Sequence, residues 1–448
     1  MDDILTRRRE RIREFIEEQK NDWIIDELKD LHEADIAELF ETLKKDERTY
    51  VFNLLETEEK ALVITELEEG TRESLIAALD NSTIVDIIEE VDSDEAADIV
   101  QYLPEEQQEE ILDSVDQDVA EDVQELIHYA EDTAGGIMRL EYIDVNENIP
   151  VSQAREKVKQ LSTDWEMENI YNVWVVDDKG ILRGYVSLQN LITADENILI
   201  KSIANEEIRS VYPDIDQEEV AKLAIKYSLV AVPVVDYSER LIGIVSFNNI
   251  VDVIGEEADE DISKLSGSGD ITPSEESSLR ITRARMPWLL VALFGELISA
   301  FVIFQFAADL QKAVALSFFF PVIMAMGGNV GIQASAIIVR GLATGEISSF
   351  AIRSRLLREL RASLLIGVMC ACILFTIITF WLKDYRMGLT VAIALFIVVS
   401  NAATIGTLMP FVLNRMKIDP AVSTGPFITT SNDIFGLLIY LLIVTSFL

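Results

Sequence analysis

Apolar residues are distributed in two different ways along the chain, and the distribution changes near Arg283. Beyond that residue they form long apolar segments at roughly 286–308, 313–339, 362–382, 388–413 and 421–447. Each segment reaches the roughly 20 residues with which an α-helix crosses the hydrocarbon core of a bilayer. Before Arg283, apolar residues occur in short runs among many charged ones. The pattern predicts a multidomain membrane protein, with an α-helical transmembrane domain of five spans over 283–448.

Residues 21–130 show short segments with the period of amphipathic helices. One segment is repeated, because Asp35–Phe40 matches Glu95–Val100 sixty residues later. Short helices that repeat in this way stack into superhelical arrays. We therefore predict an all-α superhelical N domain whose acidic side chains face solvent. A separate basic helix is expected over 1–20, which contains Arg7-Arg8-Arg9 and Arg11.

Residues 131–254 contain a second repeat, in which the two copies are offset by 59 residues. Val175-Val176-Asp177 matches Val234-Val235-Asp236, and Gly184–Ser187 matches Gly243–Ser246. The β-branched runs and turn residues predict a helix, a strand, a turn, a strand and a helix in each copy. This α/β repeat resembles a tandem of CBS (cystathionine-β-synthase) modules, which usually pair into a disc and often regulate by ligand binding. Such tandems occur in enzymes and in chloride channels, so the modules alone assign no function.

Residues 255–282 are expected to connect the two halves through a helix. A run of acids begins three residues before this segment and continues into it, and it consists of Asp252, Glu256, Glu257, Asp259, Glu260 and Asp261. The sequence Ser266–Gly269 is expected to end the helix before the membrane. A run of like charges is usually a solvated face. Because this run lies next to the spans, a role at their cytoplasmic mouth is an equally open interpretation.

The basic residues of the membrane half gather in alternate loops. Arg283 and Arg285 precede the first span, and the other two basic loops contain Arg340, Arg353, Arg355, Arg358, Arg361, Arg415 and Lys417. The positive-inside rule places these loops and the N-terminal half in the cytoplasm, and five spans leave the C-terminus outside. The start of the chain, Met1-Asp2-Asp3, has no apolar signal region, which favours the same orientation. We expect a multi-pass protein of the cell (inner) membrane.

Charge is divided unevenly between the halves. Residues 1–282 carry a net charge of about −46 and residues 283–448 one of about +5. Such an acidic half repels nucleic acid and anionic lipid, and it attracts cations. His32 and His128 are the only histidines, and Cys370 and Cys372 lie in an apolar segment, so no zinc, haem or disulfide is expected. No nucleophile with a paired base and no phosphate loop is evident, so an enzyme is not expected.

Asp433 lies inside the last apolar segment, where Tyr440 is the only other ionisable residue between Gly425 and Leu448. A carboxylate near the middle of a membrane helix costs several kcal/mol unless it faces water, a cation or a partner. Carboxylate and carbonyl oxygens are hard ligands that suit Mg²⁺ or Ca²⁺. Asp433 is therefore predicted to be a cation site in a pore. A symmetric homodimer would bring two copies of it to one axis.

Other polar residues lie inside the spans. Pro321 and several glycines interrupt the second span, which favours either a polar lining or close helix packing. Asn329 and Gln333, four residues apart on one face, favour the lining. Gly425-Pro426 suggests a broken helix start whose carbonyls face an ion. The residues expected to line the pore are Gly328, Asn329, Gln333, Asn401 and Thr430.

Glu296 is a second carboxylate inside a span. Three roles are open for it: a group that titrates with protons, an ion ligand at the flank of the pore, and an interhelical hydrogen-bond donor when protonated. The last is favoured, because no neighbour in sequence offers a cation.

The order of these parts resembles the MgtE magnesium channels, which are homodimers with an acidic N domain, a CBS pair, a plug helix and five membrane helices. The resemblance covers residues 25–448 and rests on four motifs. These are Glu131-Asp-Thr-Ala-Gly-Gly-Ile-Met138, Pro321-x-x-Met-x-Met-Gly-Gly-Asn-x-Gly-x-Gln333, Asn401-x-x-x-x-Gly406-x-Leu-Met-Pro410 and Asp419-Pro-Ala-x-x-x-Gly-Pro426-x-x-x-Thr-x-x-Asp433.

The resemblance implies that Asp433 holds hydrated Mg²⁺ in the pore, with backbone groups near Gly425 and Thr429 completing the site. It also implies that cytosolic Mg²⁺ bridges acids of the N domain, the CBS pair and the plug helix and favours the closed state. The matching positions are Asp92, Asp94, Glu95, Asp216, Glu218, Asp252, Glu256, Asp259 and Glu260.

Two departures from the family pattern are present. Asn248-Asn249 stands where an Asp-Asp pair is common, which removes two sensor ligands. Asn190 and Asn249 stand where CBS modules that bind adenosine nucleotides often have Asp for the ribose, which argues against ATP binding.

We therefore expect a Mg²⁺-selective, Mg²⁺-gated channel for Mg²⁺ uptake, whose partners are a second copy, membrane lipid and divalent cations. The alternative is a secondary divalent-metal transporter, coupled to cations or protons, that uses Glu296 and Asp433. A membrane-anchored sensor without a pore is a third possibility.

Overall fold

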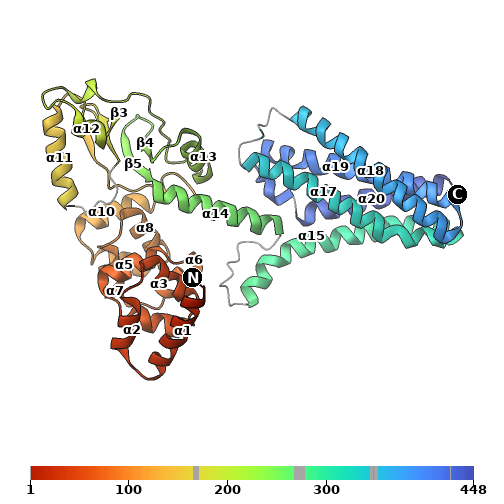
Figure 1. Ribbon diagram of the computed structural model, residues 1–448, viewed down its shortest axis with the longest axis horizontal. Coiled ribbons are helices and arrows are strands. Elements are labelled where there is room, and N and C mark those ends of the chain that lie inside the picture. The colour runs from red at the N-terminus through yellow and green to blue at the C-terminus, as the bar shows by residue number, and fades with distance from the viewer. Residues whose placement is uncertain are drawn as a thin grey trace. The chain divides into compact units, whose positions relative to one another are not determined.

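The computed structural model describes residues 2–164, 171–266, 278–343, 347, 352–423 and 425–447 (Figure 1). The chain divides into two compact units, Met1–Gly255 and Glu256–Leu448. The first unit contains the predicted helical N domain and the predicted pair of α/β repeats. The second contains the predicted membrane helices.

The N domain is built from short helices, as the sequence predicts. They are α1 (Asp2–Glu17), α2 (Asn21–Leu28), α3 (Glu33–Glu41), α4 (Lys45–Phe52), α5 (Thr57–Thr65), α6 (Glu69–Ile76), α7 (Asn81–Ile88), α8 (Ser93–Gln101), α9 (Glu105–Leu112) and α10 (Gln117–Leu126). Helices this short are marginal in water on their own, so they depend on packing. Phe40, Phe52 and Ile88 are fully buried where the helices meet.

Helix α1 packs on this core, so it is not the separate part that the sequence suggested. Ile12 and Phe15 are buried in the same cluster as the apolar residues of α2 to α10. Arg13 donates a hydrogen bond of 2.9 Å to Glu47, and Arg11 forms an ion pair with Glu27. The apolar face of α1 holds it in place, and Arg11 and Arg13 pair with acids of the N domain.

The next region has the predicted order of strands and helices. Its elements are β1 (Asp144–Asn146), α11 (Val151–Asp164), β2 (Asn172–Val176), β3 (Leu182–Ser187), α12 (Leu188–Thr193), the 3₁₀-helix η1 (Ile200–Ser202), α13 (Gln217–Tyr227), β4 (Ala231–Val235), β5 (Leu241–Ser246) and α14 (Phe247–Ser266). Strand β2 pairs with β1 in parallel and with β3 antiparallel, while β4 and β5 form an antiparallel pair.

The two copies of this repeat are equivalent in register as well as in sequence. Asn172 pairs with Ser187 in the first copy and Ala231 with Ser246 in the second, and each pair of strands has an irregularity at its last Val-Val step. In the first turn the Asp177 carboxylate accepts the backbone N–H groups of residues 179 and 181. Asp236 does the same in the second turn for residues 238 and 240. The offset of 59 residues therefore reflects a structural repeat.

Helix α14 begins at Phe247, inside the second repeat, and continues to Ser266. The connecting helix that the sequence predicts from residue 255 onward is thus the second half of a longer helix. Of the expected helix break at Ser266–Gly269, only Ser266 belongs to the described part of the chain.

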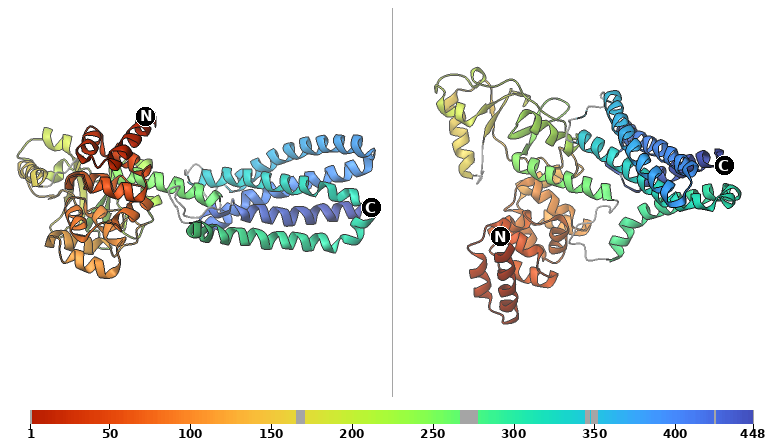
Figure 2. Two further views of the ribbon diagram at one scale, coloured as in Figure 1. Left: turned by 90° about the horizontal axis from the view of Figure 1, so that it is seen from below. Right: turned by 45° about the vertical axis from the view of Figure 1, so that its right-hand side comes forward.

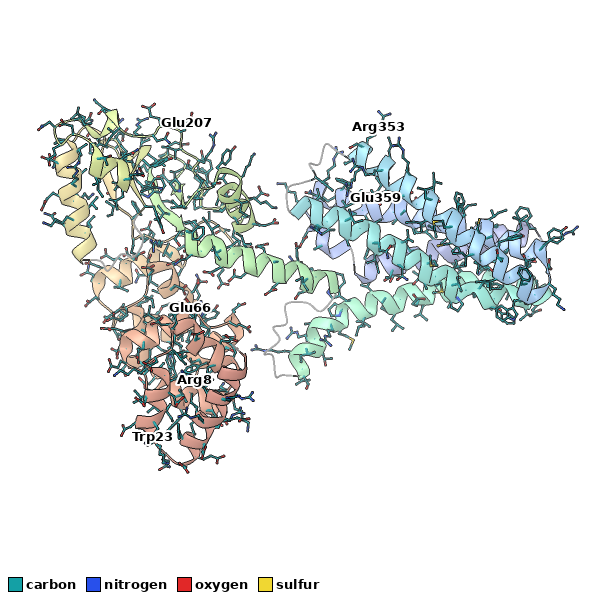
Figure 3. The ribbon with its side chains drawn as sticks, viewed as in Figure 1. Arg8, Trp23, Glu66, Glu207, Arg353 and Glu359 are labelled. Carbon is teal, nitrogen blue, oxygen red and sulfur yellow. The ribbon has the colours of Figure 1, made fainter. Side chains whose placement is uncertain are left out.

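The described residues of the second unit contain five helices long and apolar enough to cross a membrane, as predicted. Its elements are α15 (Ser278–Gln305), α16 (Ala307–Lys312), η2 (Val314–Phe319), α17 (Phe320–Ala343), α18 (Ile352–Leu382), α19 (Tyr385–Arg415), η4 (Pro420–Ser423) and α20 (Pro426–Ser446). Figure 2 shows the long helices running alongside one another in a bundle. Charged side chains such as Arg353 and Glu359 lie at the start of α18, before its apolar stretch (Figure 3).

Helix α17 is continuous, so its glycines do not interrupt the second span as the sequence suggested. Pro321 falls at the start of the helix, where its missing N–H group costs nothing. A Cβ atom on Gly406 of α19 would collide with the carbonyl oxygen of Gly331 of α17. These two glycines therefore allow the backbones of α17 and α19 to approach closely.

Candidate functional site

Helix α20 positions Asp433 two turns after its own start. Gly425 precedes the helix and its carbonyl accepts the N–H group of Ile428 at 3.2 Å, while Pro426 occupies the first turn. The predicted helix start at Gly425-Pro426 is confirmed. Asp433 is half-buried. The other ionisable residue of α20, Tyr440, is fully buried and donates a hydrogen bond of 2.8 Å to the Leu316 carbonyl, so it takes no part in the site.

The carboxyl group of Glu296 on α15 hydrogen-bonds to that of Asp433 on α20. Asp433 is therefore the neighbour that an interhelical hydrogen bond of Glu296 would use, and the role predicted for Glu296 stays a prediction. Close packing brings the two helices together, because a side chain at Gly295 would collide with Thr430. Glu296 itself is exposed, whereas the neighbouring Gly295 on α15 is buried.

Helix α17 contributes two polar side chains on one exposed face. Asn329 and Gln333 are both exposed and lie four residues apart, as the polar-lining interpretation requires. Gly328 leaves room beside Thr429 of α20, because a Cβ atom there would meet the Thr429 methyl group at an ordinary 3.8 Å. Asn401 on α19 is half-buried.

Thr430 and Asn432 lie between helices. Thr430 is buried against Gly295, so it lies in the packing between α20 and α15. A pore-lining residue is expected on an exposed face instead. Asn432 packs against Gly331 and is only 1 % exposed. Its amide has no hydrogen-bond partner in the described part of the protein. Sequence reasoning gave no role to Asn432, because its burial depends on α17.

The segment before α20 is tied to helix α14 inside the second unit. The Nζ atom of Lys264 lies 2.8 Å from an Asp419 oxygen and also pairs with Glu260. The other Asp419 oxygen accepts the N–H group of Ala421 at 2.7 Å. Burial opposes the charged form of Lys264, but the hydrogen bonds and charges of Asp419 and Glu260 raise its pKa. Sequence analysis did not single out this ion pair, because Lys264 and Asp419 are far apart along the chain.

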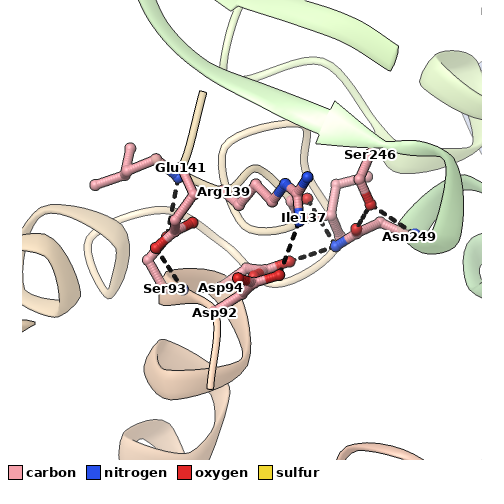
Figure 4. A network of polar contacts seen from close by, with 9 residues as sticks. Asp92, Ser93, Asp94, Ile137, Arg139, Glu141, Ser246 and Asn249 are labelled. Carbon is pink, nitrogen blue, oxygen red and sulfur yellow. Dashed lines mark hydrogen bonds and ion pairs between the residues drawn. The ribbon is translucent and has the colours of Figure 1, made fainter. Parts of the chain in front are cut away.

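A second group of acids lies in the first unit, where the N domain meets the α/β repeats (Figure 4). Asp94 of α8 is only 5 % exposed. One of its oxygens accepts a hydrogen bond from the side-chain amide of Asn249 on α14, which also donates to the Ile137 carbonyl at 3.2 Å. The other oxygen, Oδ1, has no hydrogen-bond partner within the described ranges.

Two further acids complete the contact around Asp94. Asp92 pairs with Arg139 at 2.8 Å. Glu141 accepts hydrogen bonds from the backbone N–H group of Ser93 at 3.1 Å and from its hydroxyl at 2.9 Å. A carboxylate that accepts an N–H group at a helix N-terminus is stabilised there. Glu141 therefore caps α8 from the other domain, and sequence analysis had not identified Arg139 or Glu141.

The acids of this group are poorly compensated. Burial, and then the charge of Asp92, raises the pKa of Asp94. Burial raises the pKa of Glu95 to about 8, although Arg72 at 3.2 Å lowers it. Burial and the charge of Asp92 raise the pKa of Glu141 to about 7. Protons or a cation would therefore stabilise this contact.

Asp252 of α14 extends the same group. Its charge raises the pKa of Glu95, so the two carboxylates are near each other. Burial raises the pKa of Asp252, and Arg72 lowers it. The structure thus brings together Asp92, Asp94, Glu95 and Asp252 from the predicted sensor residues.

The remaining predicted sensor residues lie elsewhere. Asp216 caps α13 by accepting the N–H group of Glu218 at 2.9 Å, and Glu218 pairs with Lys222 at 2.7 Å. Glu256 and Asp259 are exposed on the second half of α14. Within the described residues, no three His, Cys, Asp or Glu side chains are arranged to hold a metal ion directly.

Comparison with known families gives three matches along the chain. Residues 320–443 match MgtE, described as a divalent cation transporter. Residues 31–132 match the MgtE intracellular N domain, and residues 134–197 and 200–256 each match the CBS domain. The predicted repeat of CBS modules is confirmed, and the membrane match includes the region around Asp433.

Individual proteins give the same result. The magnesium transporter MgtE of Bacillus subtilis is 36% identical over 327 residues, which are 73% of this chain and 72% of that protein. The magnesium transporter MgtE of Thermus thermophilus is 35% identical over 71% of each chain. Among solved structures, the cytosolic domain of the Mg²⁺ channel MgtE in complex with ATP is 33% identical, with a TM-score of 0.50 over 54% of this chain and 98% of that one.

Proposed function

Because this chain belongs to the MgtE family of divalent cation transporters, we propose that it is a Mg²⁺-selective channel for Mg²⁺ uptake that cytosolic Mg²⁺ closes. The family match includes an intracellular N domain, and the second unit has five helices fit to span a membrane. The protein is thus a multi-pass membrane protein whose N-terminal half is cytoplasmic. The relatives named as magnesium transporters support Mg²⁺ as the cargo.

The pore is proposed to run past Asp433. The observation that carries this proposal is the carboxyl group of Asp433, half-buried in a membrane helix and in contact with a second carboxyl group. Mg²⁺ dehydrates reluctantly, so it would pass with several of its waters, which donate hydrogen bonds to the carboxylate. Backbone groups at Gly425 and Thr429, and the exposed amides of Asn329 and Gln333, are proposed to complete the path.

A homodimer is proposed to supply the second wall of this path. A two-fold axis beside α17 and α20 would place two copies of Asp433 around one ion. The exposed face of Asn329 and Gln333 supports this arrangement. An amide at membrane depth is more stable in contact with protein or water than in contact with lipid.

Gating is proposed to begin at the acidic group around Asp94. Without Mg²⁺, Asp92, Asp94, Glu95 and Asp252 repel one another, and Arg72 and Arg139 compensate for part of that repulsion. Bound Mg²⁺ removes the repulsion and shifts the population to the closed form. The other acids of the predicted sensor are proposed to add to this response, and they are Asp216, Glu218, Glu256, Asp259 and Glu260.

Helix α14 supplies a route from the sensor to the pore. Its first half contains Asn249 and Asp252, and its second half contains Lys264, which pairs with Asp419 just before α20. Four spanning helices separate Lys264 from Asp419 along the chain. Their contact therefore requires both ends to lie on one side of the membrane, which supports a cytoplasmic position for the segment before α20 and a C-terminus outside.

ATP is a second candidate ligand of the CBS pair, because a related Mg²⁺ channel domain has been solved with ATP. In this chain Asn249 stands at the position that often contacts the ribose, and its side-chain amide instead donates hydrogen bonds to Asp94 and to the Ile137 carbonyl. We propose that Mg²⁺, rather than ATP, is the ligand that sets the position of the N domain.

A secondary transporter is the alternative, and the contact between Glu296 and Asp433 favours it, because paired carboxyl groups also occur where protons cross membranes. Single-channel currents that do not depend on a pH gradient would exclude this alternative. A flux that follows the proton gradient would exclude the passive channel.

The test of the pore uses the full-length protein in proteoliposomes with a Mg²⁺-sensitive dye inside. Asp433→Asn keeps the size of the side chain and removes its charge, so Mg²⁺ influx should fall by about tenfold or more. Asp384→Asn is the matched control, because Asp384 caps α19 outside the proposed path. Unchanged influx in Asp433→Asn would remove Asp433 from the pore.

A further inference from the structure

We propose that Glu296 is a second carboxylate of the cation pathway, which binds the same hydrated ion as Asp433. This inference rests on the proposed function and assigns a site residue on a helix outside α17 and α20. Each protomer would then offer two carboxylates at one level of the membrane. The geometry that supports this is the close packing of α15 on α20 at Gly295 and Thr430, which brings the carboxyl groups of Glu296 and Asp433 near each other.

The exposure of Glu296 indicates what it faces. It lies near the middle of the apolar part of α15, and its side chain is exposed, while Gly295 and Ser299 on the same helix are buried. A carboxylate at this depth is too costly to face lipid. Because it also lies near Asp433, Glu296 is assigned to the same proposed path. The helix contact at Gly295 and Thr430 holds the two carboxyl groups together.

A buried polar side chain on α15 gives a second indication of a hydrated site. Ser299, one turn after Glu296, is 2 % exposed. Its hydroxyl has no hydrogen-bond partner in the parts of the chain that the structure describes. Buried polar groups normally find partners, so this hydroxyl points to water or an ion near Glu296.

The chemistry of two adjacent carboxylates fits a hydrated divalent cation. Two carboxylates in contact repel each other strongly in a medium of low dielectric constant. A divalent cation beside them attracts both, and this attraction outweighs the repulsion between them. The waters of Mg²⁺ donate hydrogen bonds, and carboxylates only accept them. In the proposed homodimer four carboxylates would surround one ion, and a divalent cation neutralises twice as much of that negative charge as a monovalent cation does. Glu296 should therefore favour divalent over monovalent cations.

The experiment measures Mg²⁺ influx and K⁺ current of the full-length protein in proteoliposomes over a range of Mg²⁺ concentrations. Glu296→Gln keeps the hydrogen bond and removes the charge. We expect its half-maximal Mg²⁺ concentration to rise by about tenfold and its Mg²⁺ to K⁺ ratio to fall. Glu296→Asp keeps the charge and should recover most of both values. The matched control is Glu359→Gln on α18, which should behave as the unmodified protein.

The outcomes separate this inference from the proposed function. If Asp433→Asn loses influx and Glu296→Gln equals Glu359→Gln, then Glu296 is a structural hydrogen-bond partner only and the inference is wrong. If Asp433→Asn keeps full influx, the proposed pore itself fails. Recovery in Glu296→Asp excludes a general loss of folding as the cause of the effect in Glu296→Gln.

A second measurement works even where transport is lost. In a background with Cys370→Ser and Cys372→Ser, the thiol of Glu296→Cys should react with a charged, membrane-impermeant reagent. Millimolar Mg²⁺ should slow that reaction, and the same ionic strength of NaCl should not. A thiol that does not react, or that Mg²⁺ does not protect, would show that position 296 is outside the cation path and overturn the inference.

Discussion

At the scale of single residues, Asp94 and its neighbours show how a folded contact can be left short of positive charge. Asp94 is buried with one oxygen unpaired, and its amide partner Asn249 brings no charge. Arg139 and Arg72 pair with Asp92 and Glu95 instead. Because a buried carboxylate without a cation is costly, the uptake of protons or cations stabilises the contact.

The shortage of positive charge around Asp94 predicts that the stability of the first unit depends on pH. The pKa values of Glu141 and Glu95 are about 7 and about 8 in the folded protein, against about 4.3 in an unfolded chain. The folded protein therefore keeps protons that the unfolded chain has lost. Its stabilisation is complete below about pH 4 and declines as the pH rises through 7 and 8, by at most about 4 kcal/mol for Glu141.

Thermal unfolding of the full chain in detergent, with divalent cations chelated, checks this prediction. The transition of the first unit should fall in temperature between pH 5.5 and pH 8.5, and Mg²⁺ should restore it more at pH 8.5 than at pH 5.5. Glu141→Gln should flatten the pH dependence, because one titrating group is gone. A transition that does not change with pH would contradict the shifted pKa values.

Sequence reasoning found some of these residues and missed others for a physical reason. Asp433 was predicted from its position alone, because an acid in an apolar segment is costly wherever its neighbours lie. The partner of Glu296 was not predicted, because α15 and α20 meet only in the fold. Arg139 and Glu141 were missed for the same reason, since nothing in their local sequence indicates that they contact α8.

At the scale of elements, helix α14 joins two kinds of contact. Its first half forms part of the acidic group, and Lys264 in its second half is held between Glu260 and Asp419. The Lys264 and Asp419 side chains are 24% and 34% exposed, so their ion pair contributes on the order of 0.2–1 kcal/mol. That is too little to matter for folding but enough to shift an equilibrium between two states severalfold.

The ion pair predicts a measurable effect on gating. Lys264→Gln should weaken the hold of α14 on the segment before α20, so influx at closing Mg²⁺ concentrations should rise by about 1.4- to 5-fold. Asp419→Asn should do the same, and the double variant should add little to either one. Coupling in this double-mutant cycle identifies the pair as the cause. Fully additive effects would mean that Lys264 and Asp419 act on gating independently.

The elements themselves were largely predictable from the sequence. Five spans followed from segment length, and the two equivalent strand pairs followed from the repeat with its offset of 59 residues. The continuity of α17 was not predictable, because glycine signals a helix break when no neighbour is known. In the fold, Gly331 and Gly406 serve instead to bring two backbones together.

At the scale of the whole molecule, charge separates the two halves of the chain. Residues 1–282 carry about −46 and residues 283–448 about +5. General screening acts over about 8 Å at physiological ionic strength, so salt weakens the repulsion between distant exposed acids. It acts less on the partly buried group around Asp94. Mg²⁺ and simple salt should therefore affect the cytoplasmic half differently.

Limited proteolysis of the full chain in nanodiscs, run beside Mg²⁺ influx, checks that difference. Cleavage of the cytoplasmic half should slow about tenfold when Mg²⁺ is ten times above its dissociation constant, because the compact form is stabilised by binding. NaCl at the same ionic strength should protect much less. The variant Asp92→Asn, Asp94→Asn, Glu95→Gln should lose both protection and closure at high Mg²⁺, with similar midpoints for the two. Protection that persists in this variant, or that NaCl reproduces, would place the sensor elsewhere in the acidic half.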